Sequence, residues 1–128
     1  MKRLQPHFIR RRTLCLALLL LSSTVVNAAF YYVNDSSTNG DVYTQATGND
    51  EYIGNDPCCP KASIQSVLAN YPVATGDVIY VDTGTYLLTN NITINPTNSG
   101  LEDALVEIHG STNFAAGGSV LGRNSTGA

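Results

Sequence analysis

Between residues 60 and 86 the apolar positions follow helical spacing first and strand spacing afterwards. The positions that recur every three or four residues, and so share one face of a helix, are Ile64, Val67, Leu68 and Tyr71. Ser63 precedes them as a capping residue, and Pro72 is badly tolerated inside a helix. The pattern therefore predicts a helix of about two turns that ends at Asn70 or Tyr71. Because so short a helix is unstable alone in water, its apolar face must lie on other apolar groups.

Short apolar runs separated by polar turns predict several β-strands elsewhere in the chain. The strongest run is Val78–Val81, which is rich in β-branched and aromatic residues and lies between two turn segments. Further strands are expected at residues 30–33, 91–94, 105–110 and 118–122. From residue 79 onward the strand centres are separated by about 13 to 15 residues, a near-regular spacing that is typical of solenoids. A β-sandwich and a parallel β-helix both fit this pattern, which favours the β-helix only slightly.

Residues 41–60 are polar and contain many turn-forming residues. Their carboxylates and amides are the oxygen ligands that calcium prefers, but the regular alternation and the glycine position of an EF-hand loop are absent. We therefore interpret this segment as a solvated, turn-rich loop.

The first 28 residues have the order of a secretory signal peptide. Five basic residues within residues 1–12 precede an apolar run at 14–21, and small residues follow and end in Ala28. The apolar run is much shorter than the roughly 20 residues that a membrane span requires. The pattern predicts cleavage after Ala28 and a mature chain that begins at Ala29. We expect that chain to be secreted, or to lie in the periplasm or at the cell surface.

Removal of the signal peptide would leave Lys61 and Arg123 as the basic residues beside ten acidic ones, a formal net charge of −8. A chain with this balance has no basic surface for nucleic acid or for an anionic membrane, so neither is expected as a partner. It would also repel an anionic polysaccharide unless calcium or basic residues elsewhere compensated the charge.

Cys58 and Cys59 are adjacent in the predicted mature chain. Neighbouring Cα atoms are about 3.8 Å apart, which is below the usual range for a disulfide, so a bridge between the two would be strained. A disulfide partner outside the chain and two free thiols are the alternatives, and there are too few ligands nearby for a zinc site. Asn34, Asn91 and Asn124 begin glycosylation sequons, a pattern too short to predict modification in a chain rich in Asn and Thr.

The middle of the chain resembles the opening of secreted right-handed parallel β-helix proteins with the pectin-lyase-like fold. The residues that carry the resemblance are Gly48-Asn49-Asp50, Gly54, Pro57, Pro60-Lys61-Ala62-Ser63-Ile64-Gln65, Gly76-Asp77-Val78-Ile79-Tyr80-Val81 and Gly84-Thr85-Tyr86. The resemblance implies an all-β fold in which a helix caps the first coils of the β-helix. It covers roughly residues 31–121 and implies no particular activity, because such families include lyases, hydrolases and proteins without known catalysis.

Several acidic residues near strand ends could be imagined as a general acid and base. They are Asp77, Asp82, Glu102, Asp103 and Glu107, and we interpret each as a solvent-facing turn or strand residue. His109 precedes Gly110 at a strand end and is interpreted as lining a turn rather than as a ligand. Lys61 belongs to the helix region and Arg123 to the chain end, so neither is expected beside a groove that holds several acids. We therefore assign no catalytic, cofactor-binding or metal-binding residue.

These observations predict a signal peptide at residues 1–28 and the N-terminal cap and first rungs of a β-helix domain at residues 29–128. The domain is expected to continue beyond Ala128 as an incomplete solenoid, since residues 122–128 supply no apolar stripe to cover the last strand. The complete protein is then expected to act on a polysaccharide as a lyase or hydrolase, with calcium where a lyase requires it. The alternative is a non-catalytic surface or adhesin-like β-helix. We expect no catalysis from this chain alone.

Overall fold

The computed structural model describes residues 27–123. Most of the predicted signal peptide, residues 1–26, lies outside the described residues, as do residues 124–128 with the sequon at Asn124.

The predicted helix is confirmed as α1 (Ile64–Asn70). The Ser63 hydroxyl caps it by accepting a hydrogen bond of 3.1 Å from the backbone N–H of Ser66. The helix ends where Tyr71 takes an extended conformation, one residue before the proline. Ile64 and Val67 are buried on the face that the apolar spacing predicted.

Three parallel strands form the largest sheet: β1 (Phe30–Val33), β2 (Val78–Val81) and β6 (Glu107–Gly110), in the order β1-β2-β6. The register places Tyr31 beside Ile79 and Ile79 beside Ile108, whereas Tyr32, Tyr80 and His109 form the neighbouring row. Because side chains alternate along a strand, these two rows lie on opposite faces of the sheet. The first row faces the core, and the second faces outward.

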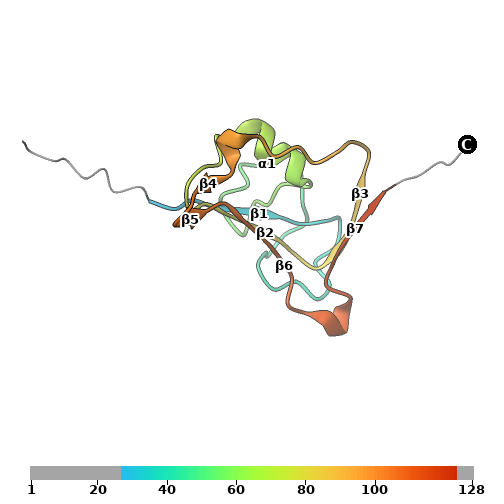
Figure 1. The fold of residues 1–128 in the computed structure, drawn as a ribbon. Helices are drawn as coiled ribbons and strands as arrows, with labels where there is room; N and C mark the ends of the chain where they lie inside the picture. Colours follow the sequence, from blue (N-terminus) through green and yellow to red (C-terminus); the bar gives the residue numbers. More distant parts are fainter. Residues whose placement is uncertain (1–26, 124–128) are drawn as a thin grey trace, which may run out of the picture.

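Two smaller sheets complete the described strands. β3 (Gly84–Leu88) pairs in parallel with β7 (Ser119–Arg123), and β4 (Gly100–Leu101) pairs in antiparallel with β5 (Ala104–Leu105). Short 3-10 helices occur at Pro96–Asn98 and Phe114–Ala116. Figure 1 shows α1 above the strands of the largest sheet, with β3 and β7 side by side at one end and β4 and β5 near the other.

The apolar core lies between α1 and the inner face of β1 and β2. Its buried members are Tyr31, Val33, Ile64, Val67, Val73, Ile79, Val81 and Tyr86. The core is small, and β6 covers it incompletely, since Ile108 on the core face of that edge strand is 38% exposed. Polar contacts must therefore hold much of the chain outside the helix and the central strands in place.

The predicted fold class, an all-β chain forming the first coils of a right-handed parallel β-helix, is wrong. The described residues instead form a small mixed fold of short strands in separate sheets of two or three strands with one helix, and they make no solenoid or closed sheet. The strand expected at residues 91–94 does not form, and β4 and β5 make a short antiparallel pair that was not expected. The near-regular spacing of apolar runs therefore did not correspond to a repeated coil.

Replacement of Val67 by aspartate tests the buried face of α1. Val67 is fully buried, so Val67→Asp would place an unpaired charge in the apolar core and lower the free energy of unfolding by at least about 3 kcal/mol. Ala69→Asp makes the same charge change at an exposed position of the same helix and should cost less than about 1 kcal/mol. Urea unfolding followed by circular dichroism measures both, and equal midpoints for the two variants would contradict the packing described.

Candidate functional site

Aromatic side chains gather on the outer face of the largest sheet. Tyr32, Tyr80 and His109 occupy the same register position on β1, β2 and β6, so their rings follow one another across the strands. Neighbouring strands lie about 4.8 Å apart, and the rings of such a row are therefore in contact range. The outer face thus carries a continuous row of rings.

Tyr80 is the centre of a larger group of rings. Its ring centroid lies 5.6 Å from Tyr32 in a stacked arrangement, 5.6 Å from His109 edge-on, 4.8 Å from Tyr43 and 6.1 Å from Phe30. These spacings are those of favourable aromatic pairs. We call Phe30, Tyr32, Tyr43, Tyr80 and His109 the ring cluster. Phe30 is 47% exposed, and the three tyrosines are half-buried, so the cluster borders on solvent.

Tyr43 comes from the long loop of residues 41–60, and the carboxylate of Asp82 fixes its backbone. One oxygen, Oδ2, accepts hydrogen bonds from the N–H groups of Tyr43 and Thr44 at 2.8 and 2.7 Å and from the Thr44 hydroxyl at 2.9 Å. The other, Oδ1, accepts from the N–H groups of Val42 and Thr83, both at 2.7 Å. The Tyr43 hydroxyl in turn donates to the carbonyl oxygen of Gly110 at 3.0 Å. Asp82 is therefore a positioning residue for the ring cluster.

Asp82 is fully buried, so the interpretation of this residue as solvent-facing is wrong. Burial by itself raises the pKa of a carboxyl group, but the hydrogen bonds from Val42, Thr83, Tyr43 and Thr44 outweigh it and hold the pKa of Asp82 below its ordinary value. At neighbouring Asp41 the balance is reversed, because burial and the charge of Asp82 raise the pKa despite a hydrogen bond from Asn34.

The rest of the loop is held by two further polar anchors. The amide nitrogen of Asn34 donates to the carbonyl oxygens of Ser37 and Ala46 and to Asp41 Oδ2. Lys61 is 4% exposed, and its Nζ donates to the carbonyl oxygens of Asp50 and Tyr52 at 2.8 and 2.6 Å. The loop has no helix or strand, as predicted, but these anchors show that it is not simply solvated.

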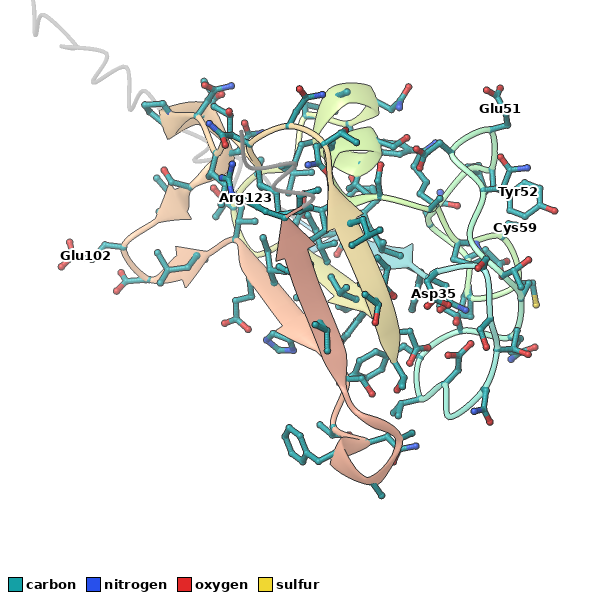
Figure 2. All side chains as sticks on the ribbon, turned by 90° about the vertical axis from the view of Figure 1, so that its right-hand side faces the viewer. Asp35, Glu51, Tyr52, Cys59, Glu102 and Arg123 are labelled. Atoms are coloured by element: carbon teal, nitrogen blue, oxygen red, sulfur yellow. The ribbon has the colours of Figure 1, made fainter. Side chains whose placement is uncertain are left out.

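Gly48 shows how closely the loop approaches the sheet. A Cβ atom at this position would lie 1.8 Å from the carbonyl oxygen of Asn34 and 2.7 Å from that of Lys61, so a side chain cannot be accommodated without a backbone shift. Figure 2 shows Glu51, Tyr52 and Cys59 on this loop, on the side of the molecule opposite Glu102.

Glu107 and His109 form a polar pair beside the ring cluster. They are two residues apart on β6 and therefore share its outer face, where His109 Nε2 and Glu107 Oε2 lie 2.5 Å apart. Both side chains are about half exposed. His109 thus lies in β6, within the strand expected at residues 105–110, and its ring contacts Tyr80.

The other acidic residues considered from the sequence are not brought together. Asp77 is buried beneath the start of β1, which contradicts the solvent-facing interpretation, whereas Glu102 and Asp103 are exposed in the turn between β4 and β5. Among residues 27–123, no group of three or more His, Cys, Asp and Glu side chains is placed to hold a metal ion. Both thiols of Cys58 and Cys59 are free, and the Cys58 thiol lies 3.3 Å from Gln45 Oε1.

A shallow hollow lies between the start of α1 and the strands β3 and β7. Apolar side chains, including Ile64, Leu87 and Leu121, form most of its lining. The Ser63 hydroxyl at its edge is already bonded to Asp50 and to the helix. The hollow therefore presents few polar groups that could orient a ligand, and the ring cluster is the stronger candidate site.

Comparisons of the chain with models of known protein families, with curated proteins and with solved structures find no match. The resemblance to secreted β-helix proteins therefore receives no support from them. Within the described part of the chain, no helix has the length and apolar character that a membrane span needs.

Replacement of Asp82 by asparagine tests the anchor of the loop. The amide keeps the size of the side chain but removes the charge and one acceptor oxygen, so Asp82→Asn should lower the free energy of unfolding at pH 7 by at least about 2 kcal/mol. Asp103→Asn, at an exposed turn position, should have little effect. Thermal and urea unfolding measure both variants, and equal losses would contradict the role given to Asp82.

The same anchor predicts a dependence on pH. Because folding lowers the pKa of Asp82, its contribution to stability is fully present above the ordinary pKa of about 3.9 and is lost as the pH falls through the lower folded value. Asp41 acts in the opposite direction, so the informative quantity is the difference in unfolding free energy between the wild type and Asp82→Asn. We expect that difference to shrink below about pH 4. A difference that stays constant from pH 7 to pH 2 would rule out the charged anchor.

Proposed function

We propose that this chain is part of an exported, non-catalytic binding protein whose ring cluster contacts a neutral polysaccharide. The observation that carries the proposal is the gathering of five ring side chains, contributed by three strands and one anchored loop, on a face that borders on solvent. Tyrosine offers an apolar ring body and a hydroxyl tip, a combination that suits surfaces that are apolar in one part and wet in another. A sugar ring has the same character, with C–H faces and a rim of hydroxyl groups.

The charge of the chain favours a neutral polymer. The predicted mature chain has a formal net charge of −8, and Glu107 lies beside the ring cluster. An anionic polymer would be repelled by both. Lys61 cannot compensate, because its ammonium group is buried and bonded to loop carbonyl oxygens.

A non-catalytic role is favoured by what the acidic residues do. Asp77 and Asp82 accept hydrogen bonds from backbone N–H groups, and Glu102 and Asp103 lie in the exposed turn between β4 and β5. Hydrolysis of a glycosidic bond generally needs two carboxyl groups across a sugar-binding cleft. We therefore propose no cleavage by this chain, whether of neutral glucans or of pectate and alginate.

A surface or adhesive role through protein contacts is the second candidate. Two large apolar side chains, Leu87 and Val120, remain exposed on the same face of the paired strands β3 and β7. Monomeric proteins rarely leave contiguous apolar patches open, so such a group favours contact with another protein surface.

Binding assays with variants of the ring cluster test the first candidate. The secreted chain should bind insoluble cellulose or chitin in a pull-down, or be retarded by a soluble neutral β-glucan in affinity electrophoresis. It should bind neither pectate nor alginate, with or without calcium. Tyr80→Ala, which removes the central ring, and Phe30→Ala, which removes the exposed one, should each weaken binding at least about tenfold. The matched control is Tyr52→Ala, since Tyr52 is 40% exposed on the loop and belongs to none of the ring pairs found among the described residues.

Circular dichroism and melting temperature must show that each variant is folded before its binding is interpreted. An equal loss of binding in Tyr52→Ala, or retention by pectate but by no neutral polymer, would overturn the proposal. Release of unsaturated products or reducing ends during the incubation would show that the chain is catalytic after all.

A further inference from the structure

We propose that the buried carboxylate of Asp77 receives the α-ammonium group that forms on Ala29 when the chain is cleaved after Ala28. The inference is independent of the ring cluster and of what it binds. It rests on a coincidence of two observations. The sequence places the predicted cleavage between Ala28 and Ala29, and the nitrogen of Ala29 donates a hydrogen bond of 2.8 Å to Asp77 Oδ1.

Asp77 has hydrogen-bond donors but no cation. It is 7% exposed, and its second oxygen, Oδ2, accepts a hydrogen bond of 2.9 Å from the N–H of Ala74. Within the described residues the structure shows one ion pair, between Glu107 and His109, so the charge of Asp77 is not balanced by a basic side chain there. A buried carboxylate is costly unless it is paired as well as hydrogen-bonded. An ammonium group at the Ala29 nitrogen would supply the missing charge at the existing distance.

The chain on either side of this nitrogen fits a processed terminus. Asn27 and Ala28 are exposed, whereas Ala29 is half-buried and its carbonyl oxygen accepts a hydrogen bond of 3.0 Å from the N–H of Val78. The bond to be cut is therefore the last one before the chain joins the sheet. The pairing of β1 with β2 and the hydrogen bond to the Ala29 carbonyl oxygen involve no residue before Ala29.

A shift of the cleavage site by one residue in either direction would prevent the pairing with Asp77. Consecutive residues advance the chain by about 3.3 to 3.6 Å, so a cut one residue earlier would move the charge away from Asp77. A cut one residue later would remove both the nitrogen that Asp77 binds and the carbonyl oxygen that Val78 binds. Among these neighbouring sites, cleavage after Ala28 alone delivers the ammonium group to the carboxylate.

The covalent step is hydrolysis of one peptide bond by a signal peptidase. Water supplies the oxygen that completes the carboxylate of Ala28, the C–N bond to Ala29 breaks, and the two protons of the water join the Ala29 N–H as an ammonium group. One anion and one cation form, and no oxidant or other reactant is required. The Ala28 carboxylate leaves with the released segment, and the ammonium group stays beside Asp77.

The first test is the mass of the product. The full 128-residue chain is expressed in a secreting host, and intact mass and N-terminal sequencing are expected to show a chain that begins at Ala29. A product that begins at any other residue overturns the proposal.

The second test uses the reactivity of the new amine. The processed chain contains two kinds of primary amine, the α-amine of Ala29 and the side chain of Lys61. The folded protein is labelled with an acetylating ester near neutral pH, and the rates at both amines are followed by mass spectrometry. Because only the neutral amine reacts and the carboxylate favours the ammonium form, the α-amine should react at least about tenfold more slowly than in urea-unfolded chain.

Asp77→Asn should abolish that protection of the α-amine, while protection of Lys61, which is buried elsewhere, stays unchanged. If Asp77→Asn does not fold, the acetylation rates of the α-amine in the folded and in the urea-unfolded wild type still test the proposal. An α-amine that reacts as fast in the folded as in the unfolded wild type overturns the proposal, as does equal protection in wild type and variant.

A third comparison separates charge pairing from ordinary hydrogen bonding. Acetylation of the α-amine keeps its N–H donor but removes its charge. The fall in melting temperature caused by Asp77→Asn should therefore be larger in the free-amine form than in the acetylated form, as a double-mutant cycle measures. Identical falls in the two forms would show that Asp77 acts only as a hydrogen-bond acceptor and would overturn the pairing.

Discussion

The carboxylate of Asp82 is the contact on which the arrangement of this small fold depends. It lies at the end of β2 and accepts hydrogen bonds from residues some 40 positions earlier, so it joins the long polar loop to the sheet. The buried apolar core is made by α1, the inner face of β1 and β2, Val73 and Tyr86, and none of its members comes from this loop. Without that carboxylate the N–H groups of residues 42–44 would lose their acceptor, and the buried N–H of Thr44 would be left without a partner, which is costly. Polar contacts thus hold this loop in place, as apolar packing holds the helix.

The same principle recurs at two other points. Lys61 is buried with its ammonium group on loop carbonyl oxygens, and Asp77 is buried with its oxygens on backbone N–H groups. Each of these side chains satisfies main-chain groups that no helix or sheet ladder reaches. Asp77, Asp82 and Lys61, which would be suspected of chemistry, are therefore occupied in holding the chain. The ring cluster on the outer face borders on solvent, and this division between occupied charges and rings that reach solvent underlies the proposed function.

Sequence reasoning found the elements that local patterns determine. The capping serine, the apolar spacing and the proline determined α1 almost to the residue, and β-branched runs marked β1, β2 and β7. It failed where contacts between distant segments decide. The alternation at residues 91–94 has no pairing partner and forms no strand, and Asp77 and Asp82 look like turn residues until the chain that covers them is known. Tyr43 could not be assigned to the ring cluster either, because its place depends on Asp82. The one available signal was that Tyr32 and Tyr80 occupy the same position in their strands, β1 and β2. In parallel strands that pair in this register, such residues share one face.

The hydrogen bonds from the loop to Asp82 come mainly from the loop's backbone, whereas the side chain of Tyr43 is what the loop presents to the ring cluster. Three of them come from the main-chain N–H groups of residues 42–44, which every residue except proline possesses. The side chain of residue 43 could therefore be exchanged while the loop keeps its attachment. Loops that a rigid scaffold positions in this way are where proteins most readily vary their specificity. Related chains could thus acquire different partners through substitutions at this one position, with the scaffold beneath it unaltered.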